Sequence, residues 1–185
     1  MKIENCKIYL VTDEKSCNGK DFYDCVERAI KGGVKIVQLR EKNISAKEFY
    51  EKALKVKEVC KRYGVLFIIN DRMDIAQAVK ADGVHLGQSD MPIEKAREIL
   101  KDRFLIGATA RNADEAVKAE LLGADYIGSG AIFGTSTKDD AKKLEMEELK
   151  KIIESVKIPV FAIGGININN ISLLKNIGLQ GICSV

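Results

Sequence analysis

The chain has 185 residues, of which 46% are apolar and 31% charged, and this composition suits one globular domain with a substantial core. Its net charge of +3 is too small to predict nucleic-acid binding, and no apolar run reaches the roughly 18 residues of a membrane span. The N-terminal residues are too polar for a signal peptide, and five cysteines without a C-x-x-C pair are typical of reduced thiols. We therefore expect one cytoplasmic domain over residues 1–185 that binds neither nucleic acid nor membrane.

Short apolar runs alternate with longer amphipathic segments along the whole chain, and Gly, Asp or Asn stands at each change. The predicted strands cover residues 7–12, 35–40, 65–70, 83–86, 104–109, 125–130, 159–164 and 181–185. The predicted helices cover residues 20–31, 45–63, 72–80, 92–101, 111–122, 145–156 and 168–177. The N-caps expected for three of these helices are Ser45, Asn112 and Asn169. Glycines that fit a positive φ at helix C-termini are Gly32, Gly64, Gly123 and Gly178.

Eight strands that alternate with helices favour parallel pairing and closure into an α/β (βα)8 TIM barrel. An open doubly wound sheet is the alternative, but the turn after the first strand, TDEKSCNGKD, lacks a G-x-G-x-x-G motif. The last predicted strand reaches Val185, so no residues remain for an eighth helix. We expect a TIM barrel whose eighth helix is missing from this chain, and a natural protein that continues beyond Val185.

Two carboxylates follow neighbouring predicted strands: Asp71 comes after the third strand and Asp90 after the fourth. Side chains just past the C-terminal ends of parallel strands converge, and a carboxylate pair can hold a hard divalent cation such as Mg2+. The alternative is that each carboxylate caps the helix that follows it. The pair, opposite nearby cations, favours magnesium.

Cationic and amide side chains follow the second and third strands. Alternation places Gln38, Arg40 and Lys42 on one side of the backbone, and Asn70 precedes Asp71. This set predicts a phosphate-binding mouth, with ordinary ion pairing inside the barrel as the alternative. The single histidine, His85, lies within a strand, where we expect a hydrogen-bonded core or mouth histidine and leave a catalytic role open.

Two glycine-rich segments complete the predicted site. Residues 128–138 form a glycine- and hydroxyl-rich loop that ends in Lys138, and it can close over a phosphate or remain a plain surface loop. Gly164 and Gly165 follow the seventh strand, where barrels commonly bind phosphate. Two phosphate-binding places, one of them with a metal, predict a magnesium-dependent enzyme that acts on a diphosphate and a second phosphorylated substrate.

The chain resembles thiamine phosphate synthases from end to end. The stretches that carry the resemblance are YLVTD (9–13), VQLREK (37–42), NDR (70–72), DGVHLGQSDMP (82–92), TSTK (135–138) and AIGGI (162–166). The resemblance implies a (βα)8 barrel that uses Mg2+ to join 4-amino-2-methyl-5-hydroxymethylpyrimidine diphosphate to 4-methyl-5-(2-hydroxyethyl)thiazole phosphate. The products would be thiamine phosphate and diphosphate, which places the protein in thiamine biosynthesis as a transferase.

The resemblance also implies roles for individual residues. Contacts to the pyrimidine diphosphate would come from Gln38, Arg40, Lys42, Asn70, Thr109 and Lys138, and Mg2+ would be bound by Asp71 and Asp90. The thiazole phosphate would be held by Thr135, Ser136, Thr137, the amide of Gly165, and a step after the eighth strand of which only Val185 is present. Thr109 stands where the family usually has serine, Arg111 where it often has histidine, and Gly134 where it often has proline.

This site needs no enzymic nucleophile. Arg40, Lys42 and Lys138 are the catalytic residues we expect, because they would neutralise the departing diphosphate. The aminopyrimidine can feed electrons to the carbon that loses diphosphate, so we expect a dissociative, carbocation-like path followed by attack of the thiazole nitrogen. The protein would orient both rings and exclude water.

Two other functions remain open. A thiazole tautomerase would bind only the thiazole phosphate and would need neither the carboxylate pair nor the diphosphate cations. A non-catalytic ligand-binding barrel would bind without releasing diphosphate. The sequence leaves the oligomeric state open, and apolar surface on the barrel helices is compatible with a homo-oligomer.

Overall fold

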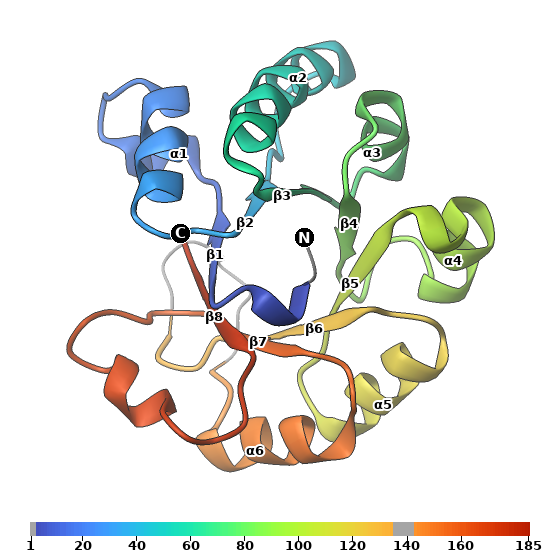
Figure 1. Cartoon of the computed structure of the whole chain (residues 1–185). Coiled ribbons are helices and arrows are strands. Elements are labelled where there is room, and N and C mark those ends of the chain that lie inside the picture. Colours follow the sequence, from blue (N-terminus) through green and yellow to red (C-terminus); the bar gives the residue numbers. More distant parts are fainter. Residues whose placement is uncertain (1–2, 135–142) are drawn as a thin grey trace.

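The computed structural model describes residues 3–134 and 143–185. Eight parallel strands pair in chain order and close into a barrel (Figure 1). The strands are β1 Ile8–Val11, β2 Ile36–Leu39, β3 Leu66–Asn70, β4 Gly83–Leu86, β5 Leu105–Thr109, β6 Tyr126–Ser129, β7 Val160–Ala162 and β8 Gly181–Ser184. β8 pairs with β1, with Tyr9 opposite Cys183, so the sheet has no open edge. The predicted TIM barrel is confirmed, and the doubly wound alternative is excluded.

The α-helices form an outer ring around the barrel (Figure 1). They are α1 Phe22–Lys31, α2 Ala46–Tyr63, α3 Met73–Val79, α4 Ile93–Leu100, α5 Ala113–Leu121 and α6 Met146–Ser155. Short 3-10 helices are η1 Ile3–Asn5, η2 Glu14–Cys17, η3 Lys101–Arg103 and η4 Ile171–Leu174. Each predicted strand and six of the seven predicted helices are therefore present. The observed bounds of these elements lie within two residues of the predicted ones.

The helix predicted over 168–177 is wrong, because only the 3-10 turn η4 forms there. Asparagine side chains take the backbone groups that a helix would use. The Asn170 carboxamide accepts from the Asn167 N–H at 2.8 Å and donates to the Gly165 carbonyl at 2.9 Å. Asn169 is not the N-cap, since its N–H donates to the Asn167 side chain at 2.9 Å. Such local hydrogen bonds compete with helix formation.

The other helix-end predictions are confirmed except for two glycines, Gly32 and Gly178. Ser45 forms a full capping box with Glu48, and the Asn112 side chain accepts from the N–H of Glu115. Gly64, Gly123 and Gly178 have positive φ, although Gly178 follows no α-helix. Gly32 keeps helical dihedrals with a φ of −75°, and the following Gly33 takes the positive φ instead.

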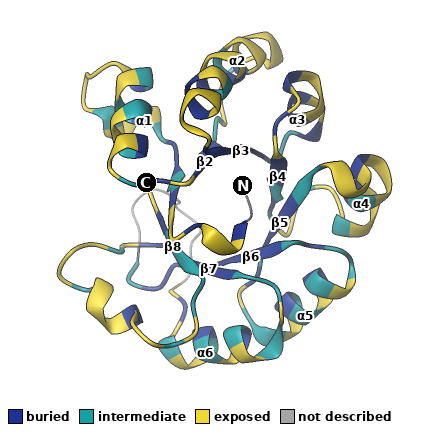
Figure 2. Cartoon of the chain, viewed as in Figure 1, coloured by how far each residue is buried: buried dark blue, intermediate teal, exposed yellow. Residues whose placement is uncertain are grey.

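Apolar side chains pack in two layers, one between strands and helices and one inside the barrel. The strands are mostly buried, and the helices carry many of the exposed residues (Figure 2). Inside, Tyr9, Tyr126 and Phe161 meet with ring centroids 5.6 to 6.0 Å apart. Ile3 of η1 joins the same interior cluster from the N-terminal end of the barrel. The aromatic layer fills the middle of the barrel and leaves space at the C-terminal ends of the strands.

No helix in the described part of the chain combines the length and the apolar character needed to cross a membrane.

Candidate active site

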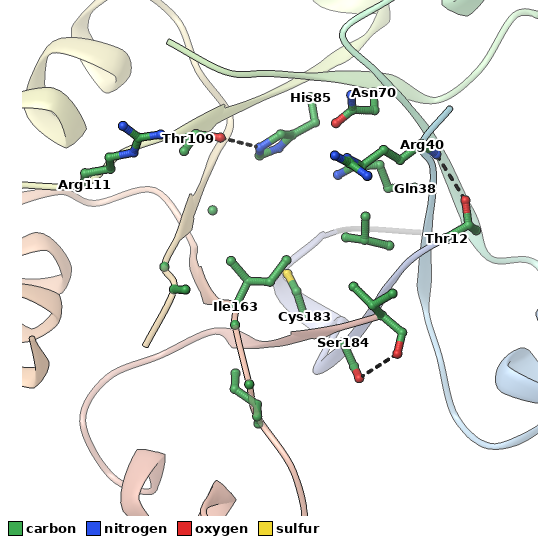
Figure 3. A pocket seen from close by; sticks show the side chains of 18 residues that line it. Thr12, Gln38, Arg40, Asn70, His85, Thr109, Arg111, Ile163, Cys183 and Ser184 are labelled. Carbon is green, nitrogen blue, oxygen red and sulfur yellow. Dashed lines mark hydrogen bonds between the residues drawn. The ribbon is translucent and has the colours of Figure 1, made fainter. Parts of the chain in front are cut away.

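A pocket of about 360 Å3 opens at the C-terminal ends of the strands (Figure 3). This is the face at which TIM barrels carry their chemistry. Predicted substrate-binding residues that line the pocket are Gln38, Arg40, Asn70, Thr109, Gly165 and Val185. The structure therefore brings together residues that come from the ends of five different strands.

The end of β2 sends alternate side chains in opposite directions. Gln38 is buried in the pocket wall, and Arg40 points into the pocket (Figure 3). Between Arg40 and Lys42, Glu41 turns outward and pairs with Lys52 on α2. The Arg40 N–H donates to the Thr12 hydroxyl at 3.1 Å, which joins this segment to the end of β1. The ion pair on the outer side thus helps to keep the two cations on the mouth side.

Asp71 and Asp90 meet beside Lys42. Lys42 Nζ lies 2.5 Å from Asp71 Oδ2, and the two carboxyl groups share a hydrogen bond. Burial by itself raises the pKa of Asp71, but the hydrogen bonds from Lys42 and Asp90 outweigh it, so the pKa is lowered. The pKa of Asp90 is raised by burial and then by the adjacent Asp71. The pair shows the electrostatic conflict that a bound cation relieves.

Neither carboxylate caps the helix that follows it. The N-cap positions of α3 and α4 are Arg72 and Pro92, and neither makes a side-chain capping bond. Asp90 Oδ2 instead accepts from the Gly87 N–H at 2.7 Å, and Asp71 has a φ of 60°. The capping alternative is therefore wrong for both residues.

The donor set of this pair fits Mg2+. Carboxylate oxygens are hard ligands, and the Lys42 ammonium shows that a cation is accommodated beside Asp71. Within residues 3–134 and 143–185, no three His, Cys, Asp or Glu side chains gather to form a metal cage. Two carboxylates that leave further positions to water and phosphate oxygens are typical of magnesium sites.

Glycines at the end of β7 let two loops approach closely. Gly165 has a φ of 64°, and a Cβ on it would lie 2.3 Å from the Gly134 carbonyl oxygen. A Cβ on Gly164 would lie 2.5 Å from the Cα of Ala131. The β7 loop therefore packs directly on the segment that follows β6. The predicted phosphate-binding residues Thr135, Ser136, Thr137 and Lys138 lie outside the described residues.

The sequence reasoning missed a buried polar layer beneath the pocket. Tyr9 and Tyr126 are 1% and 0% exposed, and their hydroxyls lie 2.8 Å apart. His85 hydrogen-bonds to Tyr126 and Thr109, so the prediction of a hydrogen-bonded histidine is confirmed. Burial raises the pKa of both tyrosines. Their positions on β1 and β6 were the available signal, because a tyrosine that points into a barrel must find a partner for its hydroxyl.

Comparisons with known proteins agree with this site. The sequence model of a family described as thiamine monophosphate synthase matches residues 8–185. A protein of Fusobacterium nucleatum named thiamine-phosphate synthase is 83% identical over 100% of this chain and 90% of its own length. A thiamine-phosphate synthase of Clostridium acetobutylicum is 54% identical over 98% of this chain and 86% of its own length.

A solved structure agrees as well. The thiamine phosphate pyrophosphorylase of Pyrococcus furiosus superposes with a TM-score of 0.89 at 42% identity, over 98% of this chain and 86% of that one. Its fold and sequence match together, whereas fold alone would not indicate an activity. The family match and these relatives show that the chain belongs to the thiamine monophosphate synthase family.

Proposed function

We propose that the pocket joins 4-amino-2-methyl-5-hydroxymethylpyrimidine diphosphate to 4-methyl-5-(2-hydroxyethyl)thiazole phosphate by a dissociative path that releases diphosphate. The protein is a thiamine-phosphate synthase, a transferase of thiamine biosynthesis, as its relatives are. The observation that supports the path is that Arg40 lines the pocket while Lys42 meets the Asp71 and Asp90 pair just past β3 and β4, outside the residues that line the pocket. This arrangement suits a leaving group that carries several negative charges.

The residues at the ends of β2, β3 and β4 act on the diphosphate. Asp71 and Asp90 would hold Mg2+, which would supply positive charge to the phosphate oxygens when bound. Arg40 donates from a planar guanidinium that suits phosphate oxygens, and Lys42 adds a mobile ammonium. Because these cations already lie at the site before the reaction, they stabilise charge as it develops on the departing diphosphate. Lys138 joins them in this proposal.

The pocket wall handles the pyrimidine and its carbon. Gln38 and Asn70 are buried amides that can bind polar edges of the ring, and Thr109 can contact the diphosphate. The 4-amino group of the pyrimidine donates electron density to the carbon that loses diphosphate. A positively charged carbon then forms, and the thiazole nitrogen attacks it. The enclosing side chains must keep water from this carbon.

The end of β7 faces the second substrate in this proposal. The amide of Gly165 and Val185 at the end of β8 would bind the thiazole phosphate. Thr135, Ser136 and Thr137 join them in this proposal, as the resemblance implies. Support comes from the positive φ of Gly165 and its contact with Gly134, which leave no room for a side chain there. Backbone N–H groups in such turns form anion-binding concavities.

The test is release of diphosphate from wild type and Asp71→Asn, with both substrates and with each one alone, at a series of Mg2+ concentrations. We expect release that needs both substrates and the metal, and a loss of about 100-fold or more in Asp71→Asn. Asp74→Asn is the matched control, because Asp74 lies on α3 and forms an ion pair with Arg72 on the surface. Tight binding of thiazole phosphate without diphosphate release would instead support the tautomerase or the binding-protein alternative.

A further inference from the structure

A chain of hydrogen bonds crosses the barrel beneath the pocket. Gln38 Nε2 lies 2.6 Å from the Tyr9 hydroxyl, which lies 2.8 Å from the Tyr126 hydroxyl. The Tyr126 hydroxyl lies 3.2 Å from His85 Nδ1, and His85 Nε2 lies 3.0 Å from Thr109 Oγ1. Figure 3 shows the last of these contacts at the pocket wall. The chain connects two predicted substrate-binding residues, Gln38 and Thr109, through three side chains to which the reaction assigns no role.

The chemistry of the groups gives the chain a direction. An amide nitrogen only donates, so Tyr9 accepts from Gln38 and its own O–H is available to Tyr126. Tyr126 then accepts from Tyr9 and donates to Nδ1 of His85. An Nδ1 that accepts is unprotonated, so the proton of a neutral ring lies on Nε2 and is donated to Thr109.

We propose that this directed chain holds His85 as the neutral Nε2–H tautomer and thereby leaves the Thr109 O–H free to donate into the pocket. Tyr9, Tyr126 and His85 are positioning residues that act through Thr109. The proposal rests on the proposed function for one point, namely that the group which Thr109 meets is the diphosphate. An anion such as diphosphate binds hydrogen-bond donors. If the hydrogen bonds ran in the reverse direction, Thr109 would donate its only hydroxyl proton to His85 and could not donate to the anion.

Two glycines make room for the contact between Tyr126 and His85. A Cβ on Gly107 would lie 2.3 Å from the Tyr126 hydroxyl and 2.6 Å from His85 Nδ1. A Cβ on Gly128 would lie 3.0 Å from His85 Cε1. Glycines on β5 and β6 therefore leave the space in which the tyrosine and the histidine meet.

Burial keeps solvent away from the two tyrosine hydroxyls that set the direction of the hydrogen bonds. Tyr9 and Tyr126 are almost fully buried, and Phe161 packs its ring against both. Burial therefore keeps water from replacing either partner, and it also raises the pKa of both tyrosines. At the other end, Gln88 donates to the Thr109 carbonyl at 2.5 Å and holds the backbone of that residue.

The first test reads the tautomer in the free protein. His85 is the single histidine of the chain, so a long-range 1H–15N spectrum of the imidazole contains one set of signals and needs no assignment by mutation. We expect a pyrrole-type nitrogen that couples strongly to both ring C–H protons, which identifies it as Nε2. A protonated Nδ1, or a doubly protonated ring, would overturn the proposal. The spectrum does not depend on the enzymatic reaction.

The second test asks whether Tyr126 acts through Thr109. Tyr126→Phe should lower kcat about tenfold, the scale of one hydrogen bond to a charged group, and change KM for the pyrimidine diphosphate little. In a Thr109→Val background the same change should have no further effect on kcat, because the hydroxyl that Tyr126 positions is gone. Thr109→Ser should restore the sensitivity to Tyr126→Phe.

The control is Tyr63→Phe, which removes a hydroxyl that hydrogen-bonds to Glu27 far from the pocket. It should leave both the tautomer and kcat unchanged. An equal loss from Tyr126→Phe in the wild-type and Thr109→Val backgrounds would show a general packing effect and refute the proposal. A wild-type protein that shows the Nε2–H tautomer but releases no diphosphate would refute the proposed function and leave the tautomer assignment standing.

Discussion

Lys42 Nζ lies 2.5 Å from Asp71 Oδ2, and this ion pair joins the segments that follow β2 and β3. Half of the Lys42 side chain is exposed, so the ammonium can move away from Asp71 when another cation or a diphosphate arrives. Under the proposed function, the same lysine would oppose metal binding in the free protein and would assist the leaving group during the reaction.

Lys42→Met should separate these two effects. Without diphosphate, Mg2+ should bind about 2 to 5 times more tightly, because a partly exposed ion pair contributes only about 0.2–1 kcal/mol. Diphosphate release should still fall by about tenfold or more, since one phosphate-binding cation is lost. Titration calorimetry gives the first quantity and steady-state kinetics the second. Lys47→Met on the exposed face of α2 is the control, and weaker Mg2+ binding in Lys42→Met would contradict the argument.

Gly165→Ala should damage both stability and the second phosphate site. Its φ of 64° disfavours alanine by about 1–2 kcal/mol, and the added Cβ would also meet the Gly134 carbonyl at 2.3 Å. Gly19→Ala is a matched control, since Gly19 has a φ of 77° with nothing within 4 Å of a Cβ. Urea unfolding should show a larger loss for Gly165→Ala, and only this variant should raise KM for the thiazole phosphate. Equal losses would show that the close approach is unimportant.

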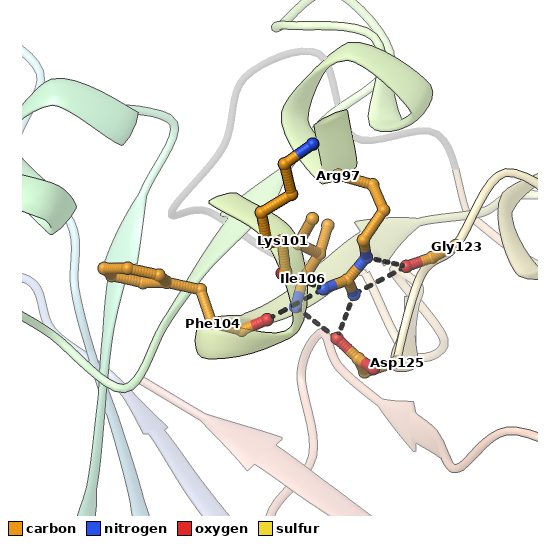
Figure 4. A network of polar contacts seen from close by, with 6 residues as sticks. All are labelled: Arg97, Lys101, Phe104, Ile106, Gly123 and Asp125. Carbon is orange, nitrogen blue, oxygen red and sulfur yellow. Dashed lines mark hydrogen bonds and ion pairs between the residues drawn. The ribbon is translucent and has the colours of Figure 1, made fainter. Parts of the chain in front are cut away.

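Arg97 connects several segments at the N-terminal end of the barrel, opposite the pocket (Figure 4). Its guanidinium donates to the Gly123 carbonyl at 2.7 Å, the Phe104 carbonyl at 3.1 Å and Asp125 at 2.5 Å. These partners precede β5 and β6, at the end of the barrel that TIM barrels use for stability. Arg97 on α4 thus closes the N-terminal ends of two strands.

Arg97→Lys should therefore lower the free energy of unfolding by about 1.5–3 kcal/mol, because an ammonium cannot reproduce the planar fork of donors. At a temperature where the variant remains folded, kcat and both KM values should match those of wild type. Arg103→Lys, an exposed neighbour on η3, should change neither stability nor kinetics. A kinetic defect in folded Arg97→Lys would show that the two ends of the barrel are coupled.

The capping box at the start of α2 should make stability depend on pH. The hydrogen bonds from Ser45 lower the pKa of Glu48 below its ordinary value of 4.5. A lowered carboxyl pKa stabilises the fold above the ordinary pKa, and this contribution is lost as pH falls through the lowered value. Glu48→Gln should therefore shift the urea midpoint downward at pH 7 and much less at pH 3. Glu51→Gln on the same helix is the control, and an equal shift at both pH values would contradict the assignment.

Local pattern predicted most elements because each βα unit has its own periodicity and its own end signals. The helix predicted over residues 168–177 is the exception. These residues have an apolar spacing that suits a helix, but they form only η4. There the Asn167 and Asn170 side chains bind nearby backbone groups, and periodicity does not weigh this competition.

The candidate site was predictable in part for a topological reason. Once strand and helix alternate, parallel strands follow, and Gln38, Arg40, Asn70 and Thr109 must lie at one end of the barrel. The sequence favoured a metal pair over helix caps for Asp71 and Asp90, but it could not show which groups the two carboxylates contact. The hydrogen bond of Asp90 to the Gly87 N–H and the contact of Asp71 with Lys42 decide against the caps.

The sequence by itself determined the barrel, the face that carries the chemistry and the kinds of residue on that face. These follow from short-range pattern and from the rule that parallel strands end together. Only the tertiary structure decided which side chains touch across the barrel, such as Tyr9 with Tyr126 and His85 with Thr109. Such contacts join residues from distant strands, and they depend on the closure of the sheet and on the space left by Gly107, which no local pattern encodes.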